Sequence, residues 1–244
     1  MLRLTTISLV VLMISCRQKP MKVEEVKPVI REVSKKETQK EISPVEQEML
    51  DAGLTDLQSV LPGIFIDLKY SGTDNFLKTD VYGDLNRAYA QPDVAEKLKK
   101  AFILLKARDS NLTFLIYDAA RPLSVQKKMW EIVNTPGNDK TDYVSNPARH
   151  SVHNYGAALD ITLCDLKGNA LDMGTAFDFF GELAQPQLES IMLSEGKLTE
   201  AQVSNRKILR TVMQQAGFRQ LPTEWWHYNS CSRETAKVLY KIIE

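Results

Sequence analysis

The sequence predicts an α+β fold: a single domain with a central, mainly antiparallel sheet and flanking helices. Strand and helix signals alternate unevenly along residues 49–244, without the strict strand–helix–strand order that favours a parallel sheet. The chain has 244 residues, of which 43% are hydrophobic and 25% charged, as in an ordinary globular domain. We therefore expect one folded domain over residues 49–244.

Proline and β-rich residues mark the first elements of this domain. Pro92 occupies the favoured first-turn position of a helix, whose apolar face is formed by Val94, Leu98, Ala101, Phe102 and Leu105. Residues 112–117 (LTFLIY) predict a buried strand. Pro122 then begins a second helix, which we expect to continue through about residue 133.

The next strand and helix have equally local signals. Residues 157–163 (AALDITL) predict another core strand. Thr199 and Gln202 form a capping box, and Gly217 provides a helix stop. A helix is therefore expected over about residues 200–216.

The last two expected elements are a strand and a short helix. Residues 224–229 predict the strand. Ser232 is expected to cap the helix, because a serine hydroxyl can accept a hydrogen bond from a free N–H of the first turn. The helix periodicity predicts three residues facing the core: Ala236, Leu239 and Ile243.

Residues 1–15 predict a secretion signal. Arg3 gives a positive start, and residues 7–14 are apolar apart from one serine, a run too short to span a bilayer. Residues 13–16 (MISC) resemble the bacterial lipobox, which implies a lipid-modified Cys16 and an exported, membrane-anchored lipoprotein in the cell envelope. A plain signal peptide with an incidental cysteine, or a short anchor helix, stays open as an alternative.

Residues 16–48 predict a flexible tether between the lipid anchor and the domain. They are dense in Lys, Arg and Glu, include three prolines and lack aromatic residues, so they cannot bury enough surface to offset their ordering entropy. Over the whole chain, 31 basic and 31 acidic residues balance, which excludes the basic footprint of a nucleic-acid-binding protein. No obligate protein partner is evident.

The first candidate site is SVHNYGAALD, residues 151–160. His153 precedes the expected strand and Asp160 lies within it, and an imidazole with a carboxylate suits Zn²⁺. A single His–Asp pair is also common as a hydrogen-bonded structural pair, so this motif alone leaves both interpretations open.

The second candidate site is EWWH, residues 224–227. If a bend brings both ends of this motif to one cavity, His227 would be a third metal ligand and Glu224 a base just outside the metal shell. Two histidines and one carboxylate leave a fourth position open, as catalytic zinc sites do. In the alternative interpretation Trp225 and Trp226 are core residues, while Glu224 and His227 lie on the surface.

A third candidate is Arg121, in YDAARP at the junction of the expected strand and helix. There an arginine can stabilise an oxyanion. The alternative is a local ion pair with Asp118, which contributes little if exposed. Cys164 and Cys231 are either a disulfide or two free thiols, and three cysteines are too few for a disulfide scaffold.

Together these motifs resemble the zinc D-alanyl-D-alanine dipeptidases of bacteria. The resemblance rests on ARP (120–122), SxHxxGxAxD (151–160) and EWWHY (224–228), and extends to LKYSGTDNF (68–76) and MGTAFDF (173–179). It covers about residues 60–230.

The resemblance implies one Zn²⁺ per chain, located at the sheet and held by His153, Asp160 and His227. It implies Glu224 as the catalytic base and Arg121 as the group that polarises the carbonyl. It also implies four substrate-binding residues: Asp178 for the substrate ammonium, and Ser151, Tyr70 and Tyr82 as pocket-lining residues.

The expected activity is hydrolysis of D-Ala-D-Ala or a similar D-amino-acid dipeptide. The nearest alternative is a zinc D,D-carboxypeptidase or endopeptidase that acts on longer cell-wall peptides. An alternative of another class is a wall-peptide-binding lipoprotein without turnover. Expected partners are therefore a small dipeptide and, through Cys16, a membrane.

Overall fold

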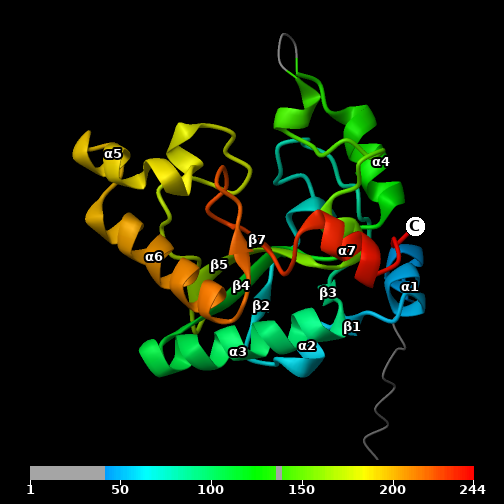
Figure 1. Cartoon of the computed structure of the whole chain (residues 1–244), viewed down its shortest axis with the longest axis horizontal. Coiled ribbons are helices and arrows are strands. Elements are labelled where there is room, and N and C mark those ends of the chain that lie inside the picture. The colour runs from blue at the N-terminus through cyan, green and yellow to red at the C-terminus, as the bar shows by residue number, and fades with distance from the viewer. Residues whose placement is uncertain (1–41, 136–138) are drawn as a thin grey trace, which may run out of the picture. The chain divides into compact units, whose positions relative to one another are not determined.

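The computed structural model describes residues 42–135 and 139–244 (Figure 1). The expected signal peptide, Cys16 and the tether up to residue 41 lie outside the described residues. Within the described part of the chain, no helix is long and apolar enough to cross a membrane.

A five-stranded sheet forms the centre, with the strand order β2-β4-β5-β7-β6. Its strands are β2 (Phe65–Ile66), β4 (Leu112–Asp118), β5 (Ala158–Asp165), β6 (Arg219–Gln220) and β7 (His227–Asn229). Only β2 and β4 pair in parallel, and the other neighbours are antiparallel. A second sheet pairs β1 (Thr55–Asp56) with β3 (Tyr89–Ala90). The predicted α+β class with a mainly antiparallel sheet is thus confirmed.

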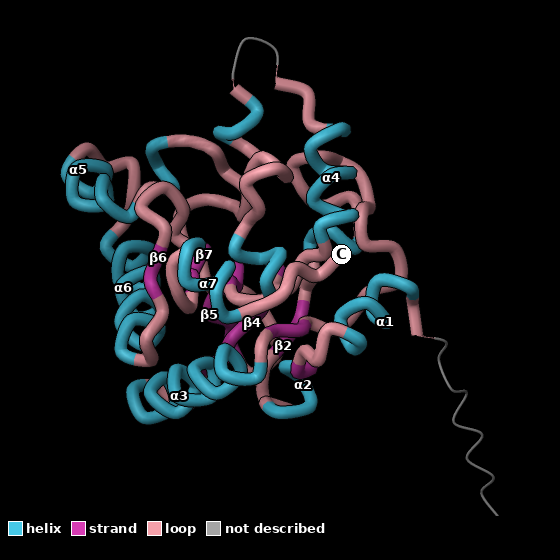
Figure 2. The backbone as a smooth tube through the Cα atoms, turned by 45° about the vertical axis from the view of Figure 1, so that its right-hand side comes forward, coloured by secondary structure: helices cyan, strands magenta, loops and turns pink. Residues whose placement is uncertain are grey.

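Helices surround this sheet, as the backbone trace shows (Figure 2). The two longest pack against each other, α3 also against β4 and α6 also against β5. The α-helices are α1 (Pro44–Asp51), α2 (Leu57–Val60), α3 (Pro92–Arg108), α4 (Leu123–Ile132), α5 (Glu189–Ser194), α6 (Glu200–Gln215) and α7 (Arg233–Leu239). Short 3-10 helices are η1 (Lys69–Ser71), η2 (Lys140–Asp142), η3 (Val152–Tyr155), η4 (Glu182–Ala184) and η5 (Pro186–Leu188).

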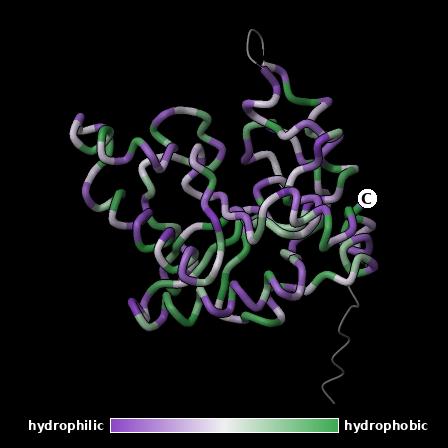
Figure 3. The backbone as a smooth tube through the Cα atoms, in the orientation of Figure 1, coloured by the Kyte–Doolittle hydropathy of each residue, from purple (hydrophilic) through white to green (hydrophobic). Residues whose placement is uncertain are grey.

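Both long helices begin where the sequence predicts. Pro92 opens α3, whose hydrophobic and hydrophilic residues alternate along the trace (Figure 3). The expected apolar face is buried except at Phe102, which is half-buried. The capping box of Thr199 and Gln202 forms at the start of α6. Local signals therefore determine these helix starts.

Three boundaries differ from the expectations. Helix α1 includes residues 44–48, the last part of the expected tether, because Ser43 caps it and Met49 is buried. The expected strand over 224–229 is only β7, since residues 222–226 form a turn and bend before it. Helix α7 ends at Leu239, before the expected end near Ile243. Leu239 is 59% exposed, so its expected inward orientation is wrong, whereas Ala236 and Ile243 are buried.

The core lies around β4 and β5, which are buried along nearly their whole length. Trp225 and Trp226 are both fully buried beside it, with ring centroids 5.3 Å apart. Cys164 and Cys231 are free thiols. The sheet therefore provides a rigid base for side chains at the ends of its central strands.

Candidate metal centre

A row of three ionisable side chains crosses the neighbouring strands β4, β5 and β7. Asp160 on β5 is the register partner of Asp118 on β4 and of His227 on β7. Residues directly opposite each other on neighbouring strands point to the same face of a sheet. A register irregularity between Ile116 and Asp118 aligns this end of β4 with Asp160. Sheet pairing therefore brings together residues that are far apart in the sequence.

His153 joins this row from the short helix η3. The hydroxyl of Ser151 accepts the backbone N–H of His153 at 3.3 Å, and Asn154 closes the capping box of this helix. Gly156 ends the helix with a φ of 65°, a left-handed conformation that glycine adopts without strain. A Cβ at Gly156 would lie 3.0 Å from the Leu54 side chain. The glycine of the motif thus permits the sharp return of the chain into β5.

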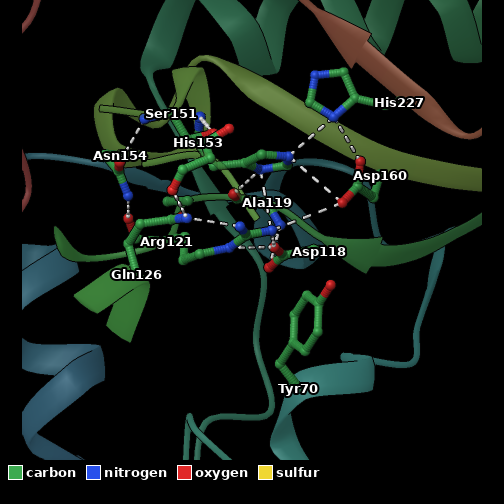
Figure 4. Close-up of polar contacts among 12 residues, drawn as sticks. Tyr70, Asp118, Ala119, Arg121, Gln126, Ser151, His153, Asn154, Asp160 and His227 are labelled. Atoms are coloured by element: carbon green, nitrogen blue, oxygen red, sulfur yellow. Dashed lines mark hydrogen bonds and ion pairs between the residues drawn. The ribbon is translucent and has the colours of Figure 1, made fainter. Parts of the chain in front are cut away.

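His153, Asp160 and His227 converge on one point (Figure 4). The Nε2 atom of His153 lies 3.2 Å from Nδ1 of His227 and 3.5 Å from Asp160 Oδ2. The Nδ1 atom of His227 lies 2.9 Å from Asp160 Oδ1. All three side chains are buried. One ligand atom from each residue therefore reaches a common position.

In both histidines, the ring nitrogen that faces away from the cluster is hydrogen-bonded to another part of the protein. Nδ1–H of His153 donates to the carbonyl of Ala119 at 2.6 Å, and Nε2–H of His227 donates to Asn229 Oδ1 at 2.9 Å. When both imidazoles are neutral, as metal ligands are, these bonds leave His153 Nε2 and His227 Nδ1 as lone-pair donors that face each other and Asp160. Such an arrangement of two imidazoles and a carboxylate fits a Zn²⁺-type cation with an open coordination position.

The electrostatics of the cluster also favour a positive charge. Burial alone would raise the pKa of Asp160, but the two imidazoles lower it well below its ordinary value. Burial alone would lower the pKa of His227, but Asp160 and Glu224 raise it to about 9. The point between the three side chains is therefore suited to a cation.

Glu224 lies beside this cluster without belonging to it. Its Oε2 is 3.9 Å from Nδ1 of His227. In a continuous strand, Glu224 and His227 would face opposite sides, because they are three residues apart. The turn and bend before β7 let both side chains face the cluster. Burial raises the pKa of Glu224, partly offset by the charge of His227. The carboxylate thus stands where a proton acceptor outside a metal shell would be needed.

Arg121 is buried and held by two side chains. Its Nε donates to Asp118 Oδ2 at 2.9 Å and its Nη2 donates to the same oxygen at 2.5 Å. Its Nη1 donates to Gln126 Oε1 at 3.0 Å. Nη2 also lies 3.9 Å from Asp160 Oδ2. A guanidinium has five N–H donors, so one N–H on each Nη atom stays available for a substrate oxygen. The local ion pair with Asp118 and a role in the cavity are therefore compatible.

Asp178 and Tyr70 form the opposite side of the site. The Tyr70 hydroxyl lies 3.1 Å from both carboxylate oxygens of Asp178, and its ring lies 5.2 Å from the Arg121 Cζ atom. Burial, together with the charge of Asp160, raises the pKa of Asp178 well above its ordinary value. A carboxyl group in this environment is suited to pair with an ammonium group.

The structure brings eight of the nine expected catalytic, metal and substrate-binding residues to one cavity of about 130 Å³. Its wall includes Tyr70, Arg121, Ser151, His153, Asp160, Asp178, Glu224 and His227. Tyr82 lies behind Asp118 instead, and its hydroxyl donates to Asp118 Oδ1 at 2.7 Å. Tyr82 therefore orients the carboxylate that holds Arg121, and does not contribute to the cavity wall.

Sequence reasoning missed several supporting residues. Asn229 shares a face of β7 with His227 two residues earlier, a spacing that the strand period could have revealed. Gln126 and Asn154 hold the side chain and the carbonyl of Arg121, at 3.0 and 2.8 Å. The sequence carries no local signal for these two contacts, because they join separate elements.

Comparison with known proteins gives consistent matches. A family model described as D-ala-D-ala dipeptidase matches residues 50–242. A D-alanyl-D-alanine dipeptidase of Escherichia coli (strain K12) is 33% identical over 175 residues, covering 72% of this chain and 83% of the relative. One of Enterococcus faecium is 31% identical over 194 residues, covering 73% of this chain and 92% of the relative. The region matched by the family model contains every residue of the cavity wall.

Proposed function

The chain belongs to the D-ala-D-ala dipeptidase family of metallopeptidases, and from this premise we propose that it hydrolyses D-alanyl-D-alanine with one Zn²⁺. The observation that carries the proposal is the convergence of His153 Nε2, Asp160 and His227 Nδ1, with each remaining imidazole nitrogen bound to the protein. The expected family resemblance is confirmed, and the identity of the metal is part of the proposal.

In the proposed hydrolysis, the metal ion, Glu224 and Arg121 each have a separate role. A bound Zn²⁺ would supply Lewis acidity, which polarises a peptide carbonyl and makes a water molecule more acidic. Glu224 takes a proton from the attacking water and returns it to the leaving amine as the C–N bond breaks. Arg121, fixed by Asp118 and Gln126, donates to the oxyanion that develops on the carbonyl. The products are two free amino acids.

Substrate size and charge follow from the cavity. A volume of about 130 Å³ suits a short peptide, and Asp178 stands at its wall to pair with a free ammonium group. A peptide blocked at its N-terminus would leave this carboxyl group without its partner, which is costly in a buried site. The proposal therefore includes selectivity for the free dipeptide.

Alanine release by the purified protein tests the proposal. D-Ala-D-Ala and an acylated tripeptide ending in D-Ala-D-Ala are each supplied with and without a chelator, and metal content is measured in parallel. Chelator-sensitive cleavage of the free dipeptide alone is expected. His153→Ala should lose both metal and activity. A full metal equivalent in this variant would contradict the ligand assignment.

A second candidate is hydrolysis of longer wall peptides. A neighbouring cavity of about 500 Å³ shares wall residues with the first, among them Tyr143, Leu221 and Glu224, and would give a longer chain room beyond the reacting carbonyl. Cleavage of the acylated peptide in the same assay would favour this function over the dipeptidase.

We also propose that the protein is exported and anchored to a membrane in the cell envelope through a lipid on Cys16. The support is the lipobox-like end of the apolar N-terminal run. Expression of Cys16→Ser beside the wild type tests it, with the membrane and soluble fractions compared. The variant should move to the soluble fraction, and its retention in the membrane fraction would contradict lipidation.

A further inference from the structure

Arg206 of helix α6 is fully buried, which is rare for an arginine. Its Nε donates to the carbonyl of Met173 at 2.6 Å, and its Nη2 donates to the carbonyl of Leu183 at 3.0 Å. These two carbonyls stand at the two ends of residues 173–183, here called the Asp178 segment, which has Asp178 at its midpoint. One guanidinium thus joins both ends of the segment that lines one side of the cavity.

The Asp178 segment needs such support because of its own backbone. Asp178 has a φ of 59°, a left-handed conformation that costs a residue with a side chain free energy. It persists only where the surrounding structure fixes it. Helix α6 supplies additional bonds next to Arg206: Asn205 Nδ2 donates to the Asp172 carbonyl at 2.9 Å, and Gln202 Nε2 to the Asp172 side chain at 2.8 Å.

The same guanidinium also packs behind the Glu224 side of the cavity. Its Cζ atom lies 5.8 Å from the ring centroid of Trp225, the neighbour of Glu224. The indole Nε1–H of Trp225 in turn donates to Thr175 Oγ1, within the Asp178 segment, at 2.7 Å. Arg206 is therefore packed behind Trp225 and behind both ends of the Asp178 segment. It is not one of the residues that line the cavity.

We propose that Arg206 is a positioning residue that sets the distance between Asp178 and Glu224. With this distance fixed, the substrate's ammonium group can bind Asp178 while its reacting carbonyl lies next to the water from which Glu224 takes a proton. The inference rests on the proposed function for the role of Asp178. It makes Arg206 a determinant of dipeptide selectivity, although it contacts no substrate.

Arginine is suited to this position because its planar fork presents donors in several fixed directions. A lysine ammonium has its three donors on one nitrogen, so it cannot present them at the separate positions of Nε and Nη2 while also lying over the indole ring. The charge of Arg206 is balanced by Glu189, whose Oε1 lies 3.7 Å from Nη1. Glu189 is also bound by Arg210, at 3.0 and 2.7 Å, so the charge of Glu189 stays paired when Arg206 is changed.

Arg206→Lys tests the proposal, with Arg210→Lys as the matched control. Arg210 lies one turn further along α6 and binds the same glutamate, but it makes no bond to the Asp178 segment. In the full-length protein, Arg206→Lys should raise KM for D-Ala-D-Ala about tenfold, because misplacing one substrate-binding group weakens binding. kcat should fall much less. The control should leave KM within about twofold of the wild type.

Two further measurements separate positioning from stability. In an Asp178→Asn background, Arg206→Lys should add little to KM, because its effect acts through Asp178. Amide hydrogen exchange over residues 174–182 should accelerate in Arg206→Lys and not in Arg210→Lys. If Arg206→Lys does not fold, Arg206→Gln, which reaches at most one carbonyl, takes its place in each measurement.

An equal rise in KM in both backgrounds, an unchanged KM, or unchanged exchange over 174–182 would overturn the proposal. These results differ from a failure of the dipeptidase function. In that case the wild type would release no alanine from D-Ala-D-Ala, while the exchange comparison would still decide whether Arg206 orders the segment.

Discussion

At the scale of single residues, the site depends on how Glu224 is kept close to the metal ligands without becoming one. The turn before β7 places its carboxylate 3.9 Å from His227, while His227 itself is bound to Asp160 and Asn229. Nδ1 of His227 is thereby directed to the cluster, and Glu224 keeps its oxygens free for the proposed proton transfer. In the proposed mechanism, Asp160 binds the metal and Glu224 accepts protons because their backbone positions differ.

Glu224→Gln is expected to lower kcat by about 10²–10⁴-fold, the usual contribution of a positioned general base. The amide cannot accept the proton of water, but it preserves the size of the side chain. Steady-state kinetics with D-Ala-D-Ala, and metal analysis of the same sample, check the prediction. Metal content should stay unchanged. A variant with near-normal kcat would remove Glu224 from the mechanism.

At the scale of elements, the four-residue 3-10 helix η3 helps to fix the positions of both His153 and Arg121. It carries His153, and its end at Gly156 allows the chain to enter β5 within two residues. The carbonyl of His153 also accepts the backbone N–H of Arg121 at 3.0 Å. The position of His153, a proposed metal ligand, is therefore linked to the position of Arg121, the proposed oxyanion-binding residue.

Gly156→Ala is expected to destabilise the protein by about 1–3 kcal/mol, because a side chain at this positive φ is strained and meets Leu54. Gly72→Ala is the control, since Gly72 has an extended φ of −167° and open space around its Cβ position. Urea unfolding of both variants measures the difference. Equal midpoints would show that the turn after η3 tolerates a Cβ.

The sequence predicts the helices of this fold better than the end of β7. Pro92 and the capping box of Thr199 and Gln202 are local signals, and the helices start where these residues stand. The start of β7 depends on its register with β5, which begins at His227. Residues 224–226 match a strand pattern, but the chain bends there, and Trp226 keeps a single backbone bond to β5, accepted from Ile161 N–H at 3.0 Å. Pairing partners far away in the sequence decide where a short strand begins.

The three residues of the candidate metal cluster were predictable from motifs, whereas their supporting contacts were not. His153, Asp160 and His227 stand in compact patterns that resemble a known family. Arg206 lies on a helix whose exposed residues are mostly polar, and no spacing rule distinguishes a buried arginine there from a solvated one. The orientation of such a side chain depends on the loop that packs over it.

At the scale of the whole molecule, the folded domain begins before residue 49. Helix α1 buries Met49 completely, and Glu46 accepts a hydrogen bond from the Tyr89 hydroxyl at 2.5 Å. Tyr89 belongs to β3, which pairs with β1. Helix α1 is thus packed on the domain and contributes to its core.

A chain that begins at Ile42 is expected to be as stable as the full-length protein, whereas one that begins at Gly53 should be less stable by about 2–5 kcal/mol. Loss of a fully buried methionine accounts for a change of this size. Thermal unfolding of the two truncated chains provides the comparison. If both unfold at the same temperature, α1 does not stabilise the domain.

Removal of the metal is expected to lower the unfolding temperature by several degrees, since an ion that binds only the folded state stabilises it by about 2.7 kcal/mol at 100 times its Kd. Unfolding is monitored with excess Zn²⁺ and with a chelator. His153→Ala is the control, because it lacks one ligand. The same response to Zn²⁺ in this variant would place the stabilising ion elsewhere.

The row of side chains across β4, β5 and β7 has a consequence for folding kinetics. Asp160 and His227 are 67 residues apart in the sequence, and His153 and His227 are 74 apart. Contacts between residues so far apart in the sequence require large loops to close, which costs entropy and slows folding. We therefore expect a refolding chain to bind the proposed ion only once β5 and β7 have paired, so that ion uptake would report the completion of the sheet.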